Sequence, residues 1–331
     1  MPLSQPKVTP LPSNINLNGK TAVITGATAG LGLETARQLL RLNISTLVLA
    51  VRNLQKGKAC VTDLLNDKAV MARASEPKIH VLELDMELYE SVQRFSKKLT
   101  ATIPKVDILI LNAGICIFDY TRTKHGHERT MQVNYWSNVL LVAEMIPYLE
   151  ASADKTGSPV RITWVGSRRY YAVNSLENAD ILKSEGGSVT KYMDAEKSFV
   201  SLQRYADSKL IYALFFYALA PKMNKNKIIL NSICPGMVKT NLASDASLPV
   251  RLMVIILQAI SARTVEVGAS LVVNAAVVAG PESHGELLGD KDITEPLDWI
   301  KSERGKAVQK QLWVETVKEI GALTTLPSAF A

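Results

Sequence analysis

Cysteine is scarce in this chain of 331 residues, which contains only three. Cys60, Cys116 and Cys234 are far apart and form none of the close clusters that metal sites need. Three cysteines cannot all pair with one another, which argues against a disulfide framework. The sequence therefore favours a reducing compartment, and we expect a cytoplasmic protein.

Long hydrophobic runs are missing as well. A membrane-spanning helix takes roughly 18 to 20 apolar residues, and the longest runs here are Leu210–Ala220 and Leu252–Ala262. We expect both runs to be buried helices, although the sequence permits peripheral membrane contact. The N-terminus also lacks the basic start followed by an apolar run that marks a secretory signal.

The sequence has no segregated charge and no histidine cluster. Its net charge is +7 at pH 7, but Lys and Arg are scattered among acidic residues without interleaved aromatics. We therefore expect no nucleic-acid partner. The four histidines lack partners at metal-ligand spacing, and His125 and His127 are interpreted as a solvated pair. No metal is expected.

What the sequence does contain is a regular alternation of strand and helix patterns. From Lys20 onwards, short β-branched apolar runs alternate with longer segments of helical period, as in a parallel sheet covered on both faces. The expected strands are Thr21–Thr25, Thr46–Val51, Ile79–Leu84, Val106–Leu111, Val160–Val165, Ile228–Ile233 and a short one near Glu286–Leu288. The expected helices are about Gly32–Leu42, Leu54–Asn66, Tyr89–Thr100, Gly126–Leu149, Gln203–Lys222, Thr264–Ala279 and Lys306–Ile320.

These elements predict a doubly wound, Rossmann-type α/β fold with a mostly parallel seven-stranded sheet and helices on both faces. No linker-like stretch divides the chain. We therefore expect one domain over residues 17–331, preceded by a flexible N-terminal arm over residues 1–16.

The first expected strand runs directly into a glycine-rich turn, and a helix begins where the turn ends. The turn reads Thr25-Gly26-Ala27-Thr28-Ala29-Gly30-Leu31-Gly32, with the spacing Gly-x-x-x-Gly-x-Gly. Glycines permit positive φ and let backbone amides approach a pyrophosphate, whose charge is favoured at the positive end of a helix dipole. Because the turn follows the first strand of a βαβ unit, an ordinary tight turn is the weaker interpretation.

That spacing resembles the short-chain dehydrogenase/reductase family, and further matches to the family follow in order. They are Asn112-Ala113-Gly114 after the fourth strand, Ser167 after the fifth, Tyr205-Ala206-Asp207-Ser208-Lys209 opening a helix, and Pro235-Gly236-Met237-Val238-Lys239-Thr240 after the sixth. The resemblance covers about Leu17 to Thr240 and implies an oxidoreductase that interconverts an alcohol with a ketone or aldehyde. With the tail Pro281-Glu282-Ser283-His284-Gly285, the chain is most similar to retinol-dehydrogenase-like members of fungal type, many of which act in secondary metabolism.

Tyr205 and Lys209 are four residues apart, a spacing that places both side chains on one face of a helix. Tyr120 and Lys124 share that spacing, but they lie in a polar loop, whereas Tyr205 begins a strongly apolar helix. The resemblance implies that Tyr205 is the acid/base, that Ser167 orients the carbonyl oxygen, and that Lys209 also holds the nicotinamide ribose. A free tyrosine titrates at about pH 10, so we expect the Lys209 ammonium to lower the pKa of Tyr205.

The family's fourth catalytic residue is an asparagine in the long helix between strands four and five. Asn134 matches this position, and Asn138, one turn later, is the alternative. The role that the resemblance implies is to hold a water molecule that links Lys209 to bulk solvent.

The end of the second strand bears on the choice of cofactor. An NAD enzyme normally places an acidic residue there, but this sequence reads Arg52-Asn53. Arg52 can pair with a 2′-phosphate, which a carboxylate would repel, so we expect NADP(H), with NAD as the less favoured alternative. The resemblance implies a set of cofactor-binding residues: Thr25, Gly26, Thr28, Gly30, Leu31, Gly32, Arg52, Asp85, Met86, Asn112, Ala113, Gly114, Tyr205, Lys209, Pro235, Gly236, Val238 and Thr240.

Two segments are expected to wall the substrate pocket. Ser167 and Tyr205 are 38 positions apart, far more than in the simplest family members, so an insertion at about 170–200 lies beside the site. The second wall is a lid at about 241–265. Its apolar face favours an apolar substrate, although core packing explains the same pattern about as well. That face comprises Leu252, Met253, Ile255, Ile256 and Leu257.

Two rival functions stay open at this point. Relatives with the same cofactor loop catalyse epimerisation or dehydration through a transient keto intermediate, usually with larger substrate domains than this tail can build. A non-catalytic NADP-binding regulatory protein would be indicated by loss of the tyrosine or lysine, and both are present. The sequence identifies neither the substrate nor the oligomeric state, and it is compatible with a homo-oligomer.

Overall fold

Eight strands form one sheet in the order β3-β2-β1-β4-β5-β6-β7-β8. The computed structural model describes residues 5–172, 175–178, 180–240, 246 and 248–331. Neighbouring strands are parallel except for the antiparallel pair β7 and β8. The strands are β1 (Thr21–Thr25), β2 (Thr46–Val51), β3 (Lys78–Glu83), β4 (Ile108–Leu111), β5 (Val160–Val165), β6 (Ile228–Cys234), β7 (Leu287–Gly289) and β8 (Asp292–Thr294).

The predicted α/β fold, with helices on both faces of a mostly parallel sheet, is confirmed, with eight strands in place of seven. The missed strand, β8, is three residues long and pairs only with β7. Asp292 and Ile293 in it are exposed, so it has no buried apolar run that a pattern search could detect.

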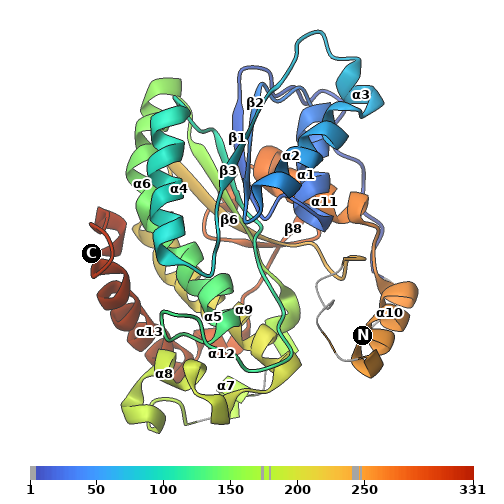
Figure 1. Cartoon of the computed structure of the whole chain (residues 1–331). Coiled ribbons are helices and arrows are strands. Elements are labelled where there is room, and N and C mark those ends of the chain that lie inside the picture. Colours follow the sequence, from blue (N-terminus) through green and yellow to red (C-terminus); the bar gives the residue numbers. More distant parts are fainter. Residues whose placement is uncertain (1–4, 173–174, 179, 241–245, 247) are drawn as a thin grey trace.

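Alternate side chains of the central strands point to opposite faces of the sheet, and each face has its own apolar core. On β1, Ala22 and Ile24 belong to one core and Val23 to the other. Helices cover both faces (Figure 1). On the Ala22 side they are α1 (Gly30–Arg41), α2 (Leu54–Leu65), α3 (Lys68–Met71) and α11 (Val265–Val273); on the Val23 side they are α4 (Tyr89–Thr102), α6 (Ser137–Thr156) and α9 (Ser201–Leu219).

Helix α9 is buried around most of its circumference, because a further helix covers the side that faces away from the sheet. That helix is α13 (Glu303–Gly321), which follows the short α12 (Asp298–Lys301). The rings of Phe215 and Trp313 stack at 5.6 Å, and each also meets Phe330. The predicted burial of the helix over residues 210–220 is confirmed.

The second predicted buried helix, α10 (Leu248–Ser261), is not buried. Its hydrogen bonds to other described segments include one from Gln258 to the Thr240 carbonyl at 3.1 Å and one from Gln5 to the Ser261 carbonyl. The prediction was wrong because a short apolar run is the same in sequence whether or not other elements cover it. Its exposed side chains include Leu252, Met253, Ile255, Ile256 and Leu257.

Other parts of the predicted lid, residues 241–245 and 247, lie outside the described residues. No helix in the described part of the chain is long and apolar enough to cross a membrane.

The N-terminal segment, predicted as a flexible arm over residues 1–16, is described from Gln5 onwards. Gln5 donates to the Met237 carbonyl at 2.8 Å and accepts from the Met237 amide at 3.0 Å. Arg263 donates to the Pro6 carbonyl, and three apolar side chains of the segment pack against the core: Val8, Leu11 and Ile15. The start of the described chain is therefore joined to the segment that follows β6.

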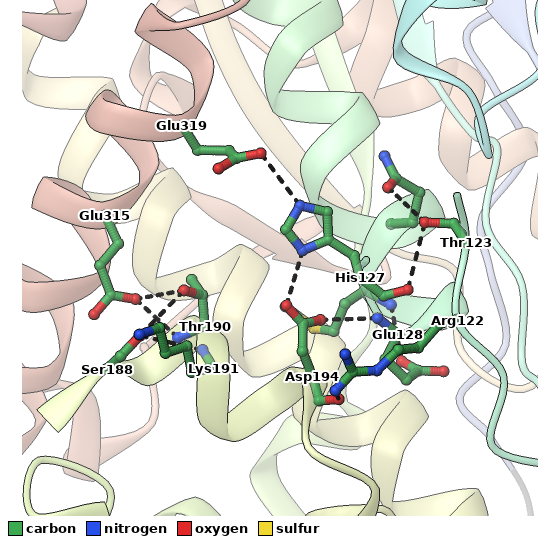
Figure 2. A network of polar contacts seen from close by, with 12 residues as sticks. Arg122, Thr123, His127, Glu128, Ser188, Thr190, Lys191, Asp194, Glu315 and Glu319 are labelled. Carbon is green, nitrogen blue, oxygen red and sulfur yellow. Dashed lines mark hydrogen bonds and ion pairs between the residues drawn. The ribbon is translucent and has the colours of Figure 1, made fainter. Parts of the chain in front are cut away.

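The predicted insertion folds into short helices between β5 and α9: η2 (Arg168–Ala172), α7 (Ser175–Asn178), η3 (Ser184–Gly187), α8 (Val189–Asp194) and η4 (Glu196–Ser198). Its residues 173–174 and 179 lie outside the described part. Helix α13 holds it through Glu315, whose carboxylate accepts from the amides of Val189 and Thr190 at 3.1 and 2.8 Å (Figure 2). These are free amides of the first turn of α8, so Glu315 caps that helix from outside.

His127 makes a second connection between the insertion and α13. Its Nδ1 lies 2.8 Å from an oxygen of Asp194, and its Nε2 lies 3.3 Å from an oxygen of Glu319 (Figure 2). The solvated histidine pair predicted from sequence is therefore wrong, since the insertion and α13 both cover His127. Burial alone would lower the pKa of His127, but the two carboxylates raise it to about 9.

This pKa predicts how stability depends on pH. A charged His127 stabilises the fold fully below its unfolded pKa of about 6.5, and the contribution is lost as pH rises through about 9. His127→Gln should therefore lower the free energy of unfolding at pH 6 by roughly 3 kcal/mol at most, and by much less at pH 10. Urea denaturation at both pH values measures the gap.

His125→Gln is the matched control, because His125 accepts a hydrogen bond from the Tyr89 amide and burial lowers its pKa. Its effect should not change between pH 7 and 10. A His127→Gln effect of equal size at pH 6 and 10 would contradict the assignment of a charged histidine.

Candidate active site

The predicted motifs meet at the carboxyl edge of the sheet. Strand β1 pairs with β2 on one side and with β4 on the other, so the strand order reverses there. In open α/β sheets, ligands bind in the crevice at such a reversal. The segments that follow β1, β2, β4, β5 and β6 carry the residues described below.

The glycine-rich turn after β1 has the backbone that a phosphate site needs. Gly26 and Gly30 have positive φ angles of 67° and 50°. A Cβ atom at Gly32 would lie 2.5 Å from both Asn112 Nδ2 and the Gly26 carbonyl oxygen, so only glycine fits. Helix α1 follows with no side-chain cap from Ala29, and its first amides are free of that competitor for an anion.

A clamp of hydrogen bonds joins this turn to the segment after β4. The buried Thr25 hydroxyl accepts from the amides of Asn112 and Ala113 at 3.0 and 2.9 Å. The Asn112 side chain donates to the carbonyls of Thr25 and Gly26. The predicted cofactor residues of these two motifs therefore lie together.

The motif after β6 reaches the same turn. A Cβ atom added to Gly30 would lie 3.4 Å from the Thr240 methyl group. Val238 lies against Gly268 of α11, and the Pro235 carbonyl accepts from Arg263 at 3.2 Å. Two other predicted turn residues, Leu31 and Thr28, face α11 and Cys60 respectively.

Arg52 and Asp85 lie farther along the edge, after β2 and β3. Arg52 is 66% exposed at the side chain and lies 3.1 Å from Glu87, which also accepts from Arg129 at 2.6 Å. Asp85 accepts from the Glu87 amide at 2.9 Å, and Met86 is buried. The structure thus gives Arg52 an acidic partner that the sequence motif did not reveal.

Asn134 lies in a π-helical turn, η1 (Gln132–Trp136), between the short α5 (Arg129–Met131) and α6. The sequence predicted one continuous helix there, and such turns are frequent at functional sites. The Asn134 side chain accepts from the Ile115 amide at 2.8 Å and donates to the Ile115 carbonyl and the Ser208 hydroxyl. It therefore ties the segment after β4 to helix α9. The alternative, Asn138, bonds within its own helix to Val133.

Ser167 follows the carboxyl end of β5, and Tyr205 and Lys209 lie in the first half of α9, where the three residues come together. The Ser167 side chain lies close enough to the Tyr205 hydroxyl to lower its pKa. Lys209 Nζ lies 5.7 Å from the centre of the Tyr205 ring and donates to the Val165 carbonyl at 3.0 Å. It also lies close to Gly114, since a Cβ atom there would be 3.9 Å from Nζ.

The pKa of Tyr205 differs from the expectation. Burial raises the pKa of Tyr205 well above its ordinary value, and the Ser167 side chain and the charge of Arg169 oppose this only in part. Burial also lowers the pKa of Lys209 to about 8. The expected lowering of the tyrosine pKa is therefore absent, because loss of water around the phenol outweighs the effects of Ser167 and Arg169.

The alternative pair does not assemble. The Tyr120 hydroxyl donates to the Asp194 carbonyl, and Lys124 pairs with Glu90 at 3.0 Å. The two side chains therefore serve separate structural contacts.

Sequence reasoning missed three residues that surround Tyr205. Cys116 and Cys234 act electrostatically on Tyr205, as does Arg169 from the start of the insertion. The Cys234 thiol also accepts from the Arg168 amide at 3.1 Å. The signal available in the sequence was position alone, since Arg169 follows Ser167 by two residues and Cys116 follows Gly114 by two.

Comparison with known proteins finds short chain dehydrogenases among those that are similar to this chain. Residues 20–176 match the family model for short chain dehydrogenases. The chain is 53% identical over 324 residues to short chain dehydrogenase macD of Penicillium terrestre, and 52% identical over 326 residues to short chain dehydrogenase yanD of Aspergillus niger. Each alignment covers 98% of this chain and 98% of the relative.

Among solved structures, the RhlG/NADP active-site complex of Pseudomonas aeruginosa has a TM-score of 0.64 at 18% identity. The match covers 84% of this chain and 97% of that one, and it concerns the fold alone.

The contacts of Asn134 and Asn138 predict that removing the two side chains lowers the free energy of unfolding by different amounts. Asn134→Ala leaves the Ile115 amide and carbonyl without their partners, so it should lower the free energy of unfolding by about 1 to 3 kcal/mol. Asn138→Ala should cost less, because its buried Oδ1 has no hydrogen-bond partner among the described residues. Urea denaturation of both variants tests the ranking, and equal costs would contradict it.

Proposed function

This chain belongs to the short-chain dehydrogenase/reductase family of oxidoreductases, and on that premise we propose an NADP(H)-dependent enzyme that interconverts a ketone or aldehyde with an alcohol. Its substrate is an apolar small molecule of fungal secondary metabolism, in keeping with the fungal relatives. The observation that carries the proposal is the grouping of Ser167, Tyr205 and Lys209 near Gly114, in the segment that is hydrogen-bonded to the glycine-rich turn.

The residues at the carboxyl edge of the sheet fit nicotinamide adenine dinucleotide phosphate, NADP(H). The uncapped start of α1 and the glycine turn suit the pyrophosphate. Arg52 suits the 2′-phosphate, and it can leave Glu87 without stranding that carboxylate, because Arg129 also bonds Glu87. When bound, the nicotinamide supplies the hydride.

In reduction, Ser167 donates a hydrogen bond to the substrate carbonyl oxygen and orients it. Tyr205 donates its proton to the same oxygen as negative charge develops there. Lys209 is assigned to the nicotinamide ribose and to the resupply of the proton, with a water molecule held by Asn134.

The rival functions have less support. Every member of the proposed acid/base set is present, which disfavours a non-catalytic binder. Epimerase or dehydratase chemistry would need a larger substrate domain, and the tail beyond β6 supplies α10 to α13 and two short strands. Three free cysteines suit the proposed cytoplasmic location.

The cofactor assignment predicts the effect of reversing the charge at residue 52. Arg52→Asp should weaken NADPH binding by about 10-fold or more and improve NADH relative to it, because attraction to the 2′-phosphate becomes repulsion. Fluorescence titration with each cofactor measures both constants. Lys97→Asp, at an exposed position of α4, changes the net charge equally and should have little effect. A wild type that prefers NADH would refute the role of Arg52.

The chemical assignment predicts the effect of removing one hydroxyl. Tyr205→Phe keeps the ring, so NADPH binding should persist while turnover of a carbonyl substrate falls by about 10² to 10⁴. Lys209→Met should damage both turnover and NADPH binding, because the ammonium serves the phenol and the ribose. The assay is NADPH oxidation with a panel of apolar ketones and aldehydes.

Tyr120→Phe is the matched control, because Tyr120 has the same spacing to a lysine but bonds the Asp194 carbonyl. Its turnover should be close to that of the wild type. Wild-type turnover by Tyr205→Phe would require this mechanism to be abandoned.

A further inference from the structure

Arg169 is fixed at the edge of the proposed active site by its own backbone. Its amide donates to the Ser167 hydroxyl oxygen at 3.1 Å. The backbone of Arg169 is therefore bonded directly to the residue that is proposed to orient the substrate carbonyl. It lies in η2, where the insertion leaves β5. Its side chain is exposed, and it has no hydrogen-bond or ion-pair partner among the residues that the structure describes.

The neighbouring arginine shows what a structural role looks like at this position. The Arg168 guanidinium lies 3.6 Å from Asp290, and its amide donates to the Cys234 thiol. Arg263 lies 2.5 Å from the same carboxylate, so the charge of Asp290 is already shared between two arginines. Arg169 has no comparable anion within the described part of the protein.

The charge of Arg169 acts on two groups of the site, the Cys116 thiol and the Tyr205 hydroxyl. Burial raises the pKa of the Cys116 thiol to about 11, and Arg169 is the one charge that acts on this thiol among the described residues. The same charge opposes the effect of burial on Tyr205. The Arg169 guanidinium therefore lies within electrostatic reach of Tyr205, and no carboxylate of the described residues pairs with it.

We propose that Arg169 binds an anionic group of the substrate, so that the substrate is an apolar carbonyl compound that also carries a carboxylate or another acidic oxygen. A guanidinium presents a planar fork of donors that matches a carboxylate with two hydrogen bonds. The inference rests on the proposed function, because it places the reacting carbonyl at Ser167 and Tyr205. It adds one acidic group, beside Arg169, to a substrate whose remainder is apolar.

Paired acids and esters provide the test. NADPH oxidation is measured with benzoylformate and methyl benzoylformate, and with 4-acetylbenzoate and methyl 4-acetylbenzoate, which hold the carboxylate at two distances from the ketone. In at least one pair, Arg169→Gln should lower the ratio of kcat/KM for the acid to that for the ester by about 10- to 100-fold. Most of the loss should be in KM, because the contact binds the substrate and does not transfer the proton.

Two control variants separate charge from general damage. Arg169→Lys keeps the charge but lacks the fork, so it should restore part of the ratio. Arg94→Gln removes an exposed arginine on α4 and should leave the ratio unchanged. An unchanged ratio in Arg169→Gln would overturn the inference. A several-fold loss of NADPH affinity in Arg169→Gln, with the ratio intact, would assign the cation to the cofactor and would also overturn it.

A binding measurement keeps the inference testable without turnover. Benzoate is titrated into the NADPH complexes of Tyr205→Phe and of the double variant Tyr205→Phe/Arg169→Gln, with NADPH fluorescence as the readout. Benzoate should bind the first complex at least about 10-fold more tightly. Equal affinities would overturn the role of Arg169 alone, whereas failure of the wild type to turn over any carbonyl probe would count against the proposed function.

Discussion

The hydroxyl of Thr25 is the contact on which the rest of this site depends. It is fully buried at the end of β1 and accepts the amides of both Asn112 and Ala113. Because β1 and β4 are the strands where the sheet order reverses, these bonds set the width of the crevice. Asn112 continues the clamp to the Gly26 carbonyl, so the glycine turn and the segment leading to Asn134 keep a fixed separation.

Much of this arrangement could be predicted because buried parallel strands have a strong local signal. Strands β1, β2 and β5 begin and end at the predicted residues, since most of their side chains are buried on both faces of the sheet. The motifs follow these strands directly, so their meeting at one edge followed from the topology. The predictions about residues outside that pattern were weaker, because exposure depends on which distant segment covers them.

His127 and α10 illustrate that limit from opposite sides. A histidine in a polar loop was expected in solvent, yet Asp194 and Glu319 come from segments 67 and 192 residues away to enclose it. An apolar run was expected in the core, yet nothing in the described chain covers Ile256, which is 59% exposed. Neither outcome is encoded near the residue concerned. The raised pKa of Tyr205 could not be predicted for the same reason, since the burial of its side chain arises from contacts that no short motif specifies.

The cover that α13 provides for α9 has a consequence for how the chain is made. Helix α9 leaves the ribosome long before Trp313 and Phe330, the aromatic side chains that shield Phe215. During that interval the nascent helix carrying Tyr205 presents an apolar flank to the surrounding water, and such a flank invites association with other chains or capture by a chaperone. The core around α9 is therefore completed only when α13 and Phe330 pack against it. Its yield in a cell depends on how fast the C-terminal helix arrives, as much as on the stability that the finished packing confers.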